Sequence, residues 1–162
     1  GLLLVKGPNV MKGYLNQPEK TKEVIKDGWY FTGDVAQMDE DGFLTITDRL
    51  SRFSKIGGEM VPHVKIEEAI HAVINSAEQI CVVSAVPDDA RGEKLVVLST
   101  RDMDAKQIRK SFMEKGLPNL WLPGESSFFR INSIPILGSG KLDLGNIKRM
   151  ALELVKTSKE VI

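Results

Sequence analysis

Two groups of residues that could do chemistry lie close together in the first third of the chain. The run from Tyr30 to Asp34 reads YFTGD, an aromatic, β-prone stretch that ends in a Gly-Asp corner. A carboxylate fixed at such a bend can accept two hydrogen bonds from a vicinal diol such as a ribose. Thr-Gly-Asp also occurs in many ordinary turns, so this motif alone leaves a plain turn open.

The second group combines cations with small residues. Asp48 and Arg49 are followed by Lys55 and by the pair Gly57 and Gly58. The arginine is a fixed cation and the lysine a flexible one, while two glycines leave room for a ligand to pass close to the backbone. The glycine pair has a second interpretation, a turn that needs positive φ.

A third group lies near the end of the chain, where Pro135 to Lys141 reads PILGSGK. A lysine at the tip of a small-residue loop suits a task in which a cation follows a charge that moves during a reaction. A Walker-type phosphate loop needs glycine at position 135 and serine or threonine after Lys141. The chain has Pro135 and Leu142 there, which excludes that interpretation. A solvated surface loop remains open.

The elements that must position the first group are mostly strands. Residues 2–6, 30–38 and 43–48 have strand character, and Pro18 to Ile25 is predicted to be a short helix. The acidic segment 39–42 joins two of these strands. Its spacing does not fit an EF-hand loop, so we predict a plain hairpin turn that ends in glycine.

After Asp48 the predicted order is β-α-β-β-α-β-α, which indicates an α+β domain with helices packed on a short sheet. Ile66 and Ile70 open an apolar stripe that continues through Val73 and Ile74. We place the domain boundary at Asp48, between a β-rich part (1–47) and an α+β part (48–162). The expected elements of the second part are a helix from Pro62, strands 79–86 and 95–100 around a polar loop at 87–93, a helix capped by Asp104, a strand at 127–134 and a helix from Asp143.

Composition excludes several classes of function. The 162 residues carry 22 basic and 22 acidic side chains, so no nucleic-acid footprint is predicted. Two histidines and one cysteine offer neither a metal cluster nor a catalytic dyad. We expect Cys81 to be a buried small hydrophobe and His63 and His71 to lie on the polar side of their helix. No apolar run is long enough for a transmembrane helix.

The order and spacing of the three groups resemble the adenylate-forming enzymes: acyl-CoA synthetases, luciferases and the adenylation domains of peptide synthetases. The resemblance implies that Asp34 holds the ribose of ATP or AMP and that Arg49 is a second ribose contact. It places the hinge of a mobile C-terminal domain at Asp48. It also implies that Lys141 drives the attack of a carboxylate on the α-phosphate.

The same resemblance implies a second conformation for the thiol step. Lys55 would then face the active site, and Gly57 and Gly58 would line a channel for the phosphopantetheine arm. Residues 1–47 would be the end of the large N-terminal domain and 48–162 the lid domain. ATP is the expected nucleotide, with Mg²⁺ bound mainly by the N-terminal domain.

Three segments, 6–11, 52–61 and 138–141, resemble a narrower group: the acyl-acyl carrier protein synthetase half of bifunctional 2-acylglycerophosphoethanolamine acyltransferase. This implies a fatty acid, acyl carrier protein or CoA as thiol, and a lysophospholipid as final acceptor. The intact protein would work at the cytoplasmic side of the inner membrane, while the fragment itself would be soluble. The alternatives are a fatty acyl-CoA ligase, another adenylating enzyme, or a non-catalytic module that docks a carrier protein.

The chain opens inside a strand-like run at residues 2–5, so we expect it to be part of a larger protein. The acid pocket and phosphate loop of the family are expected outside these residues. On its own, the fragment is therefore expected to make no acyl-adenylate.

Overall fold

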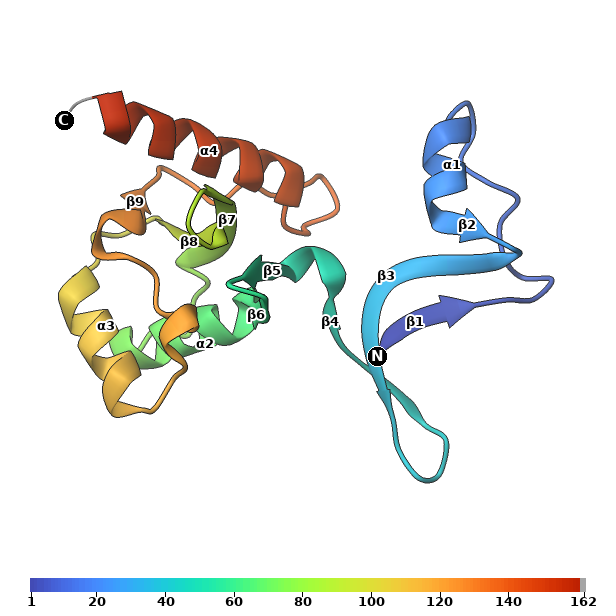
Figure 1. Ribbon diagram of the computed structural model, residues 1–162, viewed down its shortest axis with the longest axis horizontal. Helices are drawn as coiled ribbons and strands as arrows, with labels where there is room; N and C mark the ends of the chain where they lie inside the picture. The colour runs from blue at the N-terminus through green and yellow to red at the C-terminus, as the bar shows by residue number, and fades with distance from the viewer. Residues whose placement is uncertain (161–162) are drawn as a thin grey trace. The chain divides into compact units, whose positions relative to one another are not determined.

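The structure is a computed structural model that describes residues 1–160. The chain divides into two compact units, one spanning Gly1–Ser51 and one that begins at Arg52. Figure 1 labels the helices and strands of each unit. We predicted a boundary at Asp48, and the assignment of the two parts to two domains of a larger enzyme stays a prediction.

The first unit is a small sheet built around one long strand. Strand β3 (Trp29–Met38) pairs antiparallel with β1 (Leu2–Val5), β2 (Ile25–Lys26) and β4 (Leu44–Arg49). Helix α1 (Pro18–Val24) begins with a proline, whose fixed φ and missing N–H suit a first turn. The strands and the helix predicted for this unit are confirmed.

The acidic turn between β3 and β4 is a side-chain-capped hairpin. Asp39 Oδ1 accepts hydrogen bonds from the backbone N–H groups of Asp41 and Phe43, at 3.1 and 2.8 Å. Gly42 adopts φ 86°, a conformation that favours glycine. The prediction of a plain turn is confirmed, and within residues 1–160 no group of three or more metal-ligating side chains is found.

Within residues 52–160 the second unit has the predicted α+β character, with a two-stranded sheet, a three-stranded sheet and three α-helices. Strands β7 and β8 pair antiparallel, and β8 and β9 pair parallel. A 3₁₀ turn (Leu50–Arg52) spans the boundary between the two units. The elements that follow it, in chain order, are β5 (Phe53–Ile56), β6 (Glu59–Pro62), α2 (His63–Ile74), β7 (Cys81–Asp88), β8 (Gly92–Ser99), α3 (Ala105–Glu114), 3₁₀ turns at Asn119–Trp121 and Glu125–Ser127, β9 (Phe128–Arg130) and α4 (Leu144–Glu160).

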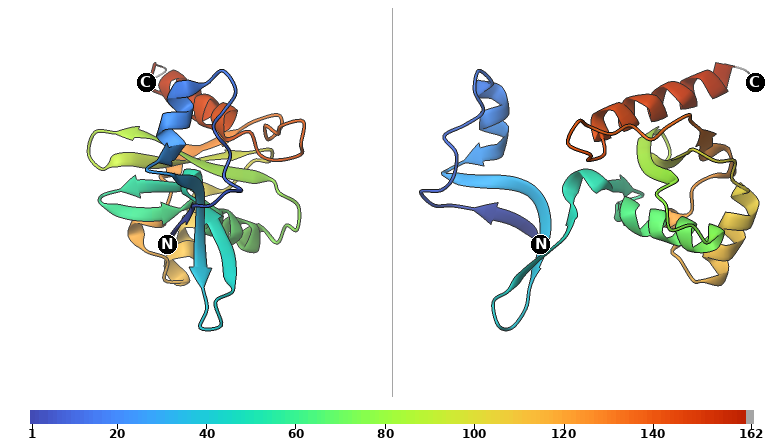
Figure 2. Two further views of the ribbon diagram at one scale, coloured as in Figure 1. Left: turned by 90° about the vertical axis from the view of Figure 1, so that its right-hand side faces the viewer. Right: turned by 180° about the vertical axis from the view of Figure 1, so that it is seen from behind.

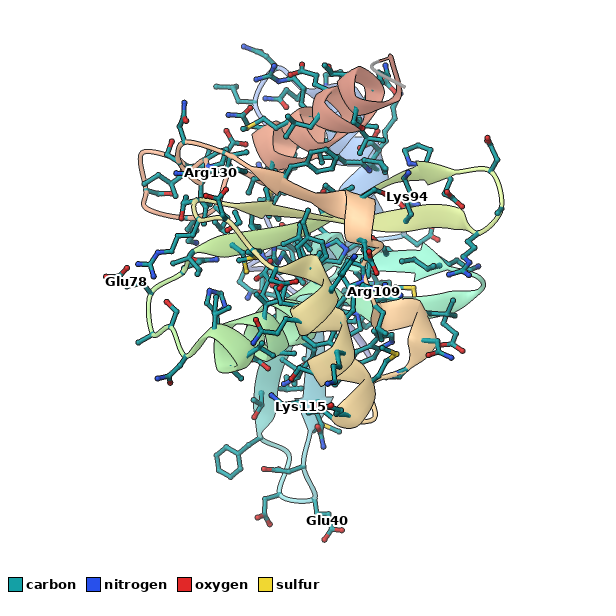
Figure 3. All side chains as sticks on the ribbon, turned by 90° about the vertical axis from the view of Figure 1, so that its left-hand side faces the viewer. Glu40, Glu78, Lys94, Arg109, Lys115 and Arg130 are labelled. Carbon is teal, nitrogen blue, oxygen red and sulfur yellow. The ribbon has the colours of Figure 1, made fainter. Side chains whose placement is uncertain are left out.

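The three-stranded sheet is buried on both faces. One face, with Val83 and Val97, packs on α2 and α3 through residues such as Ile66 and Phe112. On the other face, alternate residues of β7 and β8 pack on α4, where Ile147 is buried. Figure 3 shows α4 on one side of the sheet and α2 and α3 on the other. The covered parts of β7 (81–86) and β8 (95–98) are therefore almost entirely apolar, as expected for strands buried on both faces.

Two predicted boundaries in this unit are wrong. The polar segment 87–93 is mostly strand, because β7 continues to Asp88 and β8 starts at Gly92. The register Pro87↔Glu93 and Asp88↔Gly92 extends the ladder beyond the apolar core, where polar side chains are tolerated. The last strand is also shorter than the predicted 127–134 and ends at Arg130.

Both predicted helix starts in the second half of the unit are confirmed. Asp104 caps α3 by accepting a hydrogen bond from the N–H of Gln107 at 3.0 Å. Asp143 does the same for α4 with the N–H of Asn146, also at 3.0 Å. Cys81 is fully buried, as predicted, and burial raises the pKa of its thiol to about 12.

We expect Phe112→Ala to lower the free energy of unfolding by about 3–5 kcal/mol, because truncating a buried Phe leaves a cavity. Phe112 is 0% exposed and its neighbour Met113 is 55% exposed, so Met113→Ala is the matched control. Urea denaturation of both variants measures the difference. Equal losses in the two variants would contradict this description of the core.

Candidate functional site

The structure pairs Asp34 with Arg49 inside the first unit. The two residues are register partners on β3 and β4, and Arg49 Nε lies 2.7 Å from Asp34 Oδ1. Gly33 adopts φ 78° immediately before the aspartate, and the strand register shifts just after it. Thr32 Oγ1 accepts from the N–H of Asp34 and donates to the carbonyl of Leu3. The corner is therefore fixed by its own hydrogen bonds.

This arrangement can bind a polar ligand with hydroxyl groups. The side chain of Asp34 is 16% exposed, whereas that of Arg49 is 63% exposed and extends into solvent. A carboxylate can accept from several hydroxyls at once, and a guanidinium has several donors in a fixed plane. The pair thus presents acceptors and donors side by side.

Tyr30, the first residue of the YFTGD run, belongs to this neighbourhood, although no role of its own was predicted for it. A hydrogen bond with the Tyr14 side chain raises the pKa of Tyr30; burial and the negative charge of Asp34 add to this, and Arg49 opposes it. A tyrosine phenol is protonated near neutral pH and can donate a hydrogen bond. Its position two strand residues before Thr32 was the available signal, since alternate strand residues share a face.

Asp48 lies four residues before Arg52, with which the second compact unit begins. Its Oδ1 accepts a hydrogen bond from the N–H of Arg49 at 2.7 Å. The three residues that follow it, 49–51, are exposed, and Arg52 is buried. The hinge role predicted for Asp48 stays a prediction.

Lys55, Gly57 and Gly58 lie on the hairpin formed by β5 and β6. Gly57 has φ 58° and Gly58 has φ 92°, the pattern of a two-residue turn that requires positive φ at both positions. The conformational interpretation of the glycine pair is therefore confirmed, while the thiol-channel role stays a prediction. The side chain of Lys55 is exposed, and its backbone N–H donates to Glu93 Oε2 at 2.8 Å. A Cβ at Gly58 would meet no heavy atom within 4 Å.

The segment from Pro135 to Lys141 forms a second small hairpin before α4. Ile136 and Leu142 form an antiparallel bridge. Inside it, the N–H of Leu137 donates to the carbonyl of Lys141 at 2.7 Å, and Gly140 adopts φ 81°. The side chain of Lys141 is exposed. Within residues 1–160 no carboxylate lies within 4 Å of its ammonium.

The two hairpins lie at opposite ends of the strands β7 and β8. The N–H of Gly57 donates to the carbonyl of Arg91, in the turn that joins these strands. The Lys141 hairpin follows β9, which pairs with the other end of β8 near Ser99. Figure 2 (left) shows the β5–β6 hairpin and the loop before α4 at opposite edges of the second unit. The structure therefore does not bring Lys55 and Lys141 together.

A pocket of about 560 Å³ borders the β5–β6 hairpin. Three of its lining residues are cationic: Arg91, Lys94 and Arg109. Its two carboxylates, of Asp88 and Glu93, accept hydrogen bonds from backbone N–H groups. Figure 3 labels Lys94 and Arg109 on this side of the unit. Arg109 already donates to the backbone carbonyls of Leu122 and Pro123, so Arg91 and Lys94 are the cations of this pocket that could meet an anionic group.

The prediction that His63 and His71 lie on the polar side of their helix is wrong for His63, whose side chain is buried, whereas His71 is half-buried. His63, Glu67 and His71 are spaced four apart on α2, and His63 is only 5% exposed. We call these three residues the polar stripe. His63 Nε2 lies 2.6 Å from Ser54 Oγ, and His71 Nε2 accepts from the N–H of Ile80 at 3.2 Å. The four-residue spacing was the signal that sequence reasoning missed.

Glu67 is the centre of the polar stripe. It forms a buried ion pair with Arg52 and accepts a hydrogen bond from the N–H of Val83 at 2.6 Å. Burial raises the pKa of Glu67, and the charge of Arg52 opposes that change. Burial, together with the positive charges of Arg52 and Lys148, lowers the pKa of His63 to about 4.

Comparison with known proteins gives consistent matches over the chain, although no family model matches it. It is 48% identical over 93 residues to a long-chain-fatty-acid–CoA ligase of Bacillus subtilis, covering 57% of this chain and 16% of the relative. It is 35% identical over 153 residues to a feruloyl-CoA synthase of Amycolatopsis, covering 92% of this chain and 30% of the relative. ATP-bound MatB from Rhodopseudomonas palustris superposes with a TM-score of 0.73 at 28% identity, over 93% of this chain and 30% of that one.

The chain thus spans at most about 30% of the length of these relatives. Among its described helices, none combines the length and the apolar character that a membrane span requires.

The lowered pKa of His63 predicts a pH-dependent stability. Because the folded protein keeps this residue neutral down to about pH 4, whereas the unfolded chain protonates it near 6.5, the free energy of unfolding should fall as the pH drops between these values. The loss should reach at most about 3 kcal/mol. Urea unfolding at several pH values should show this term in the wild type and not in His63→Gln. Parallel pH profiles for the two proteins would contradict it.

Proposed function

We propose that the protein containing this chain, which belongs to the adenylate-forming acyl-CoA ligase family, is an ATP-dependent ligase that joins a fatty acid to the thiol of CoA. The chain corresponds to about 30% of its relatives, so the acid and phosphate sites are assigned to the rest of such an enzyme. In our proposal the second unit is the mobile lid that serves both half-reactions.

In the first half-reaction, a carboxylate oxygen of the fatty acid attacks the α-phosphorus of ATP. A bond forms between these atoms, the bond to the bridging oxygen breaks, and pyrophosphate leaves. Lys141 is the proposed catalytic residue, because its exposed ammonium can stabilise the charge that moves between acid and phosphate. Asp34 and Arg49 are proposed to hold the ribose hydroxyls, which the geometry of their pair suits.

Mg²⁺ would balance the phosphate charge in this step. The described part of the chain offers no cluster of ligands for it, so we assign the ion to the rest of the enzyme.

In the second half-reaction, the thiol sulfur forms a bond to the acyl carbon and its proton passes to solvent, while the bond from that carbon to the phosphate oxygen breaks and AMP leaves. Lys55 is proposed to face the site at this stage, and Gly57 and Gly58 are proposed to line the path of the thiol arm. The observation that carries this proposal is the separation of the two hairpins at opposite ends of β7 and β8. One site can use both hairpins only in turn, which requires the lid to rotate about the linker near Asp48.

CoA is the proposed thiol for two reasons. The relatives described above include ligases that are named for CoA. In addition, the pocket beside the β5–β6 hairpin carries Arg91 and Lys94, whose cationic side chains suit the phosphates of a CoA nucleotide.

A second candidate acceptor is acyl carrier protein, which the likeness of segment 52–61 to acyl-acyl carrier protein synthetases favours. In that case the acyl group would pass on to a lysophospholipid. Single-turnover transfer from a preformed acyl-adenylate to CoA and to holo-carrier protein, compared in the full-length enzyme, tests the choice. Faster transfer to the carrier protein would replace CoA in the proposal, and transfer to neither thiol would overturn the ligase assignment.

We expect Lys141→Ala in the full-length enzyme to slow fatty-acid-dependent pyrophosphate exchange by a factor on the order of 10²–10³. Thioester formation from a supplied acyl-adenylate should change far less, because the attack on the α-phosphorus is already complete in that substrate. Lys156→Ala, which removes an exposed lysine of α4, is the control. Equal losses in both half-reactions would mean that Lys141 has a structural role only.

Gly58→Trp should have the opposite effect on the two half-reactions. The indole should block the thiol path and abolish thioester formation while pyrophosphate exchange continues. Gly58 has φ 92° and open space around its Cβ position, so the folding cost is backbone strain of about 1–3 kcal/mol. Gly116→Trp is the matched control, because Gly116 also has positive φ, at 72°, and open space. Retained transfer with lost exchange would place this hairpin in the first half-reaction.

A further inference from the structure

We propose that Arg52 is a positioning residue for the thiol step, which fixes the β5–β6 hairpin and the linker to the body of the second unit through Glu67. This inference rests on the proposed function. If the second unit rotates at the linker, the contact between Arg52 and Glu67 makes Lys55 and Gly58 move rigidly with it.

The first observation is that the side chains of residues 52–56, which follow the linker, alternate in direction. Arg52, Ser54 and Ile56 are buried, whereas Phe53 is half-buried and Lys55 is exposed. The inward-facing residues thus alternate with outward-facing ones, as in a strand that packs on one side. Fixing the inward residues therefore also fixes the direction in which Lys55 extends.

The second observation is that two inward residues are held by polar contacts to the polar stripe. Arg52 Nη2 pairs with Glu67 Oε2, and Ser54 Oγ lies 2.6 Å from His63 Nε2. His63 and Glu67 are four residues apart and lie on one side of α2. These two contacts join the segment 52–54, which is the end of the 3₁₀ turn and the start of β5, to helix α2. Two contact points resist a shift of this segment along α2 better than one contact would.

The third observation is that Glu67 also connects this pair to the three-stranded sheet. Its other oxygen accepts from the N–H of Val83 on β7 at 2.6 Å. The side chains of Arg52 and Glu67 are both only 8% exposed. A directional pair with so little solvent access cannot exchange its partners for water without opening the unit.

Arg52 is also the residue at which the chain becomes anchored. Residues 49–51 are exposed, and the second compact unit begins at Arg52. Arg52 Nη1 is buried with no hydrogen-bond partner in the described part of the chain. A buried donor without a partner is costly, and an apolar side chain of similar volume would avoid that cost. Arg52 therefore contributes a fixed direction to this segment at a cost in stability.

The test separates stability from positioning with a paired variant of the full-length enzyme. Arg52→Met alone leaves the charge of Glu67 buried and unpaired, and we expect it to lower the melting temperature. Arg52→Met with Glu67→Gln removes both charges and keeps an oxygen for the N–H of Val83, so the melting temperature should recover. The same substitutions at an exposed pair of α4, Arg149→Met with Glu153→Gln, are the control.

In the paired variant we expect backbone amides of residues 49–55 to exchange with deuterium at least about tenfold faster than in the wild type, because the anchor is lost. Thioester formation should slow by about tenfold or more, since a misplacement of about 1 Å can cost on the order of 10² in rate. Pyrophosphate exchange should change by less than about threefold, because Lys141 is at the other end of the unit. The exposed-pair control should match the wild type in all three measurements.

A paired variant with wild-type amide exchange and wild-type thioester formation would overturn the proposal and leave Arg52 as a stabilising residue only. Equal slowing of both half-reactions would overturn it as well. Amide exchange needs no substrate, so it tests the anchor even if the wild-type enzyme makes no acyl-adenylate. That latter result would count against the proposed ligase function instead.

Discussion

The burial of β7 and β8 on both faces is the constraint on which the second unit depends. Their side chains alternate between a core shared with α2 and α3 and a core shared with α4. Burial of this apolar area is the main stabilising contribution, at roughly 25 cal/mol per Å². Because both faces are covered, the two ends of these strands are the places left for loops that could act on a ligand. The β5–β6 hairpin lies at one end and the Lys141 hairpin at the other.

The polar stripe of α2 is the second constraint. Besides the apolar side chains of Ile66 and Ile70, α2 buries two polar ones, those of His63 and Glu67, in the interior of the second unit. Buried polar groups are tolerated when their hydrogen bonds are made, and both of these side chains have partners. The hydrogen bonds of these two residues have fixed directions, unlike the apolar contacts beside them. In our proposal these directional contacts keep β5, α2 and the three-stranded sheet in one relative orientation.

Much of the fold could be predicted from the sequence, because strong local signals coincide with the tertiary structure. The caps at Asp104 and Asp143, the apolar stripe of α2 and the hairpin at 39–42 all depend on nearby residues. The ends of β7, β8 and β9 could not be predicted, because strand length depends on pairing with distant residues.

The candidate site could be predicted from the sequence only in part. Motif order pointed to Asp34 and Arg49, and the structure pairs them. Nothing in the local sequence around Arg52 indicates its partner, because that partner lies 15 residues away on another element. The inward position of His63 was missed for a similar reason, since its polar character suggests solvent when the strand that covers it is not considered.

Cys81 lies in the interior of the sheet and is the single cysteine among these 162 residues. With a thiol pKa of about 12, the thiolate fraction at neutral pH is on the order of 10⁻⁵, and the sulfur has no exposed surface. Maleimide and iodoacetamide reagents should therefore leave it untouched in the native protein. Surface cysteines introduced into each unit could carry fluorophores or spin labels without removal of the native thiol, which would make the orientation of the two units directly measurable in solution.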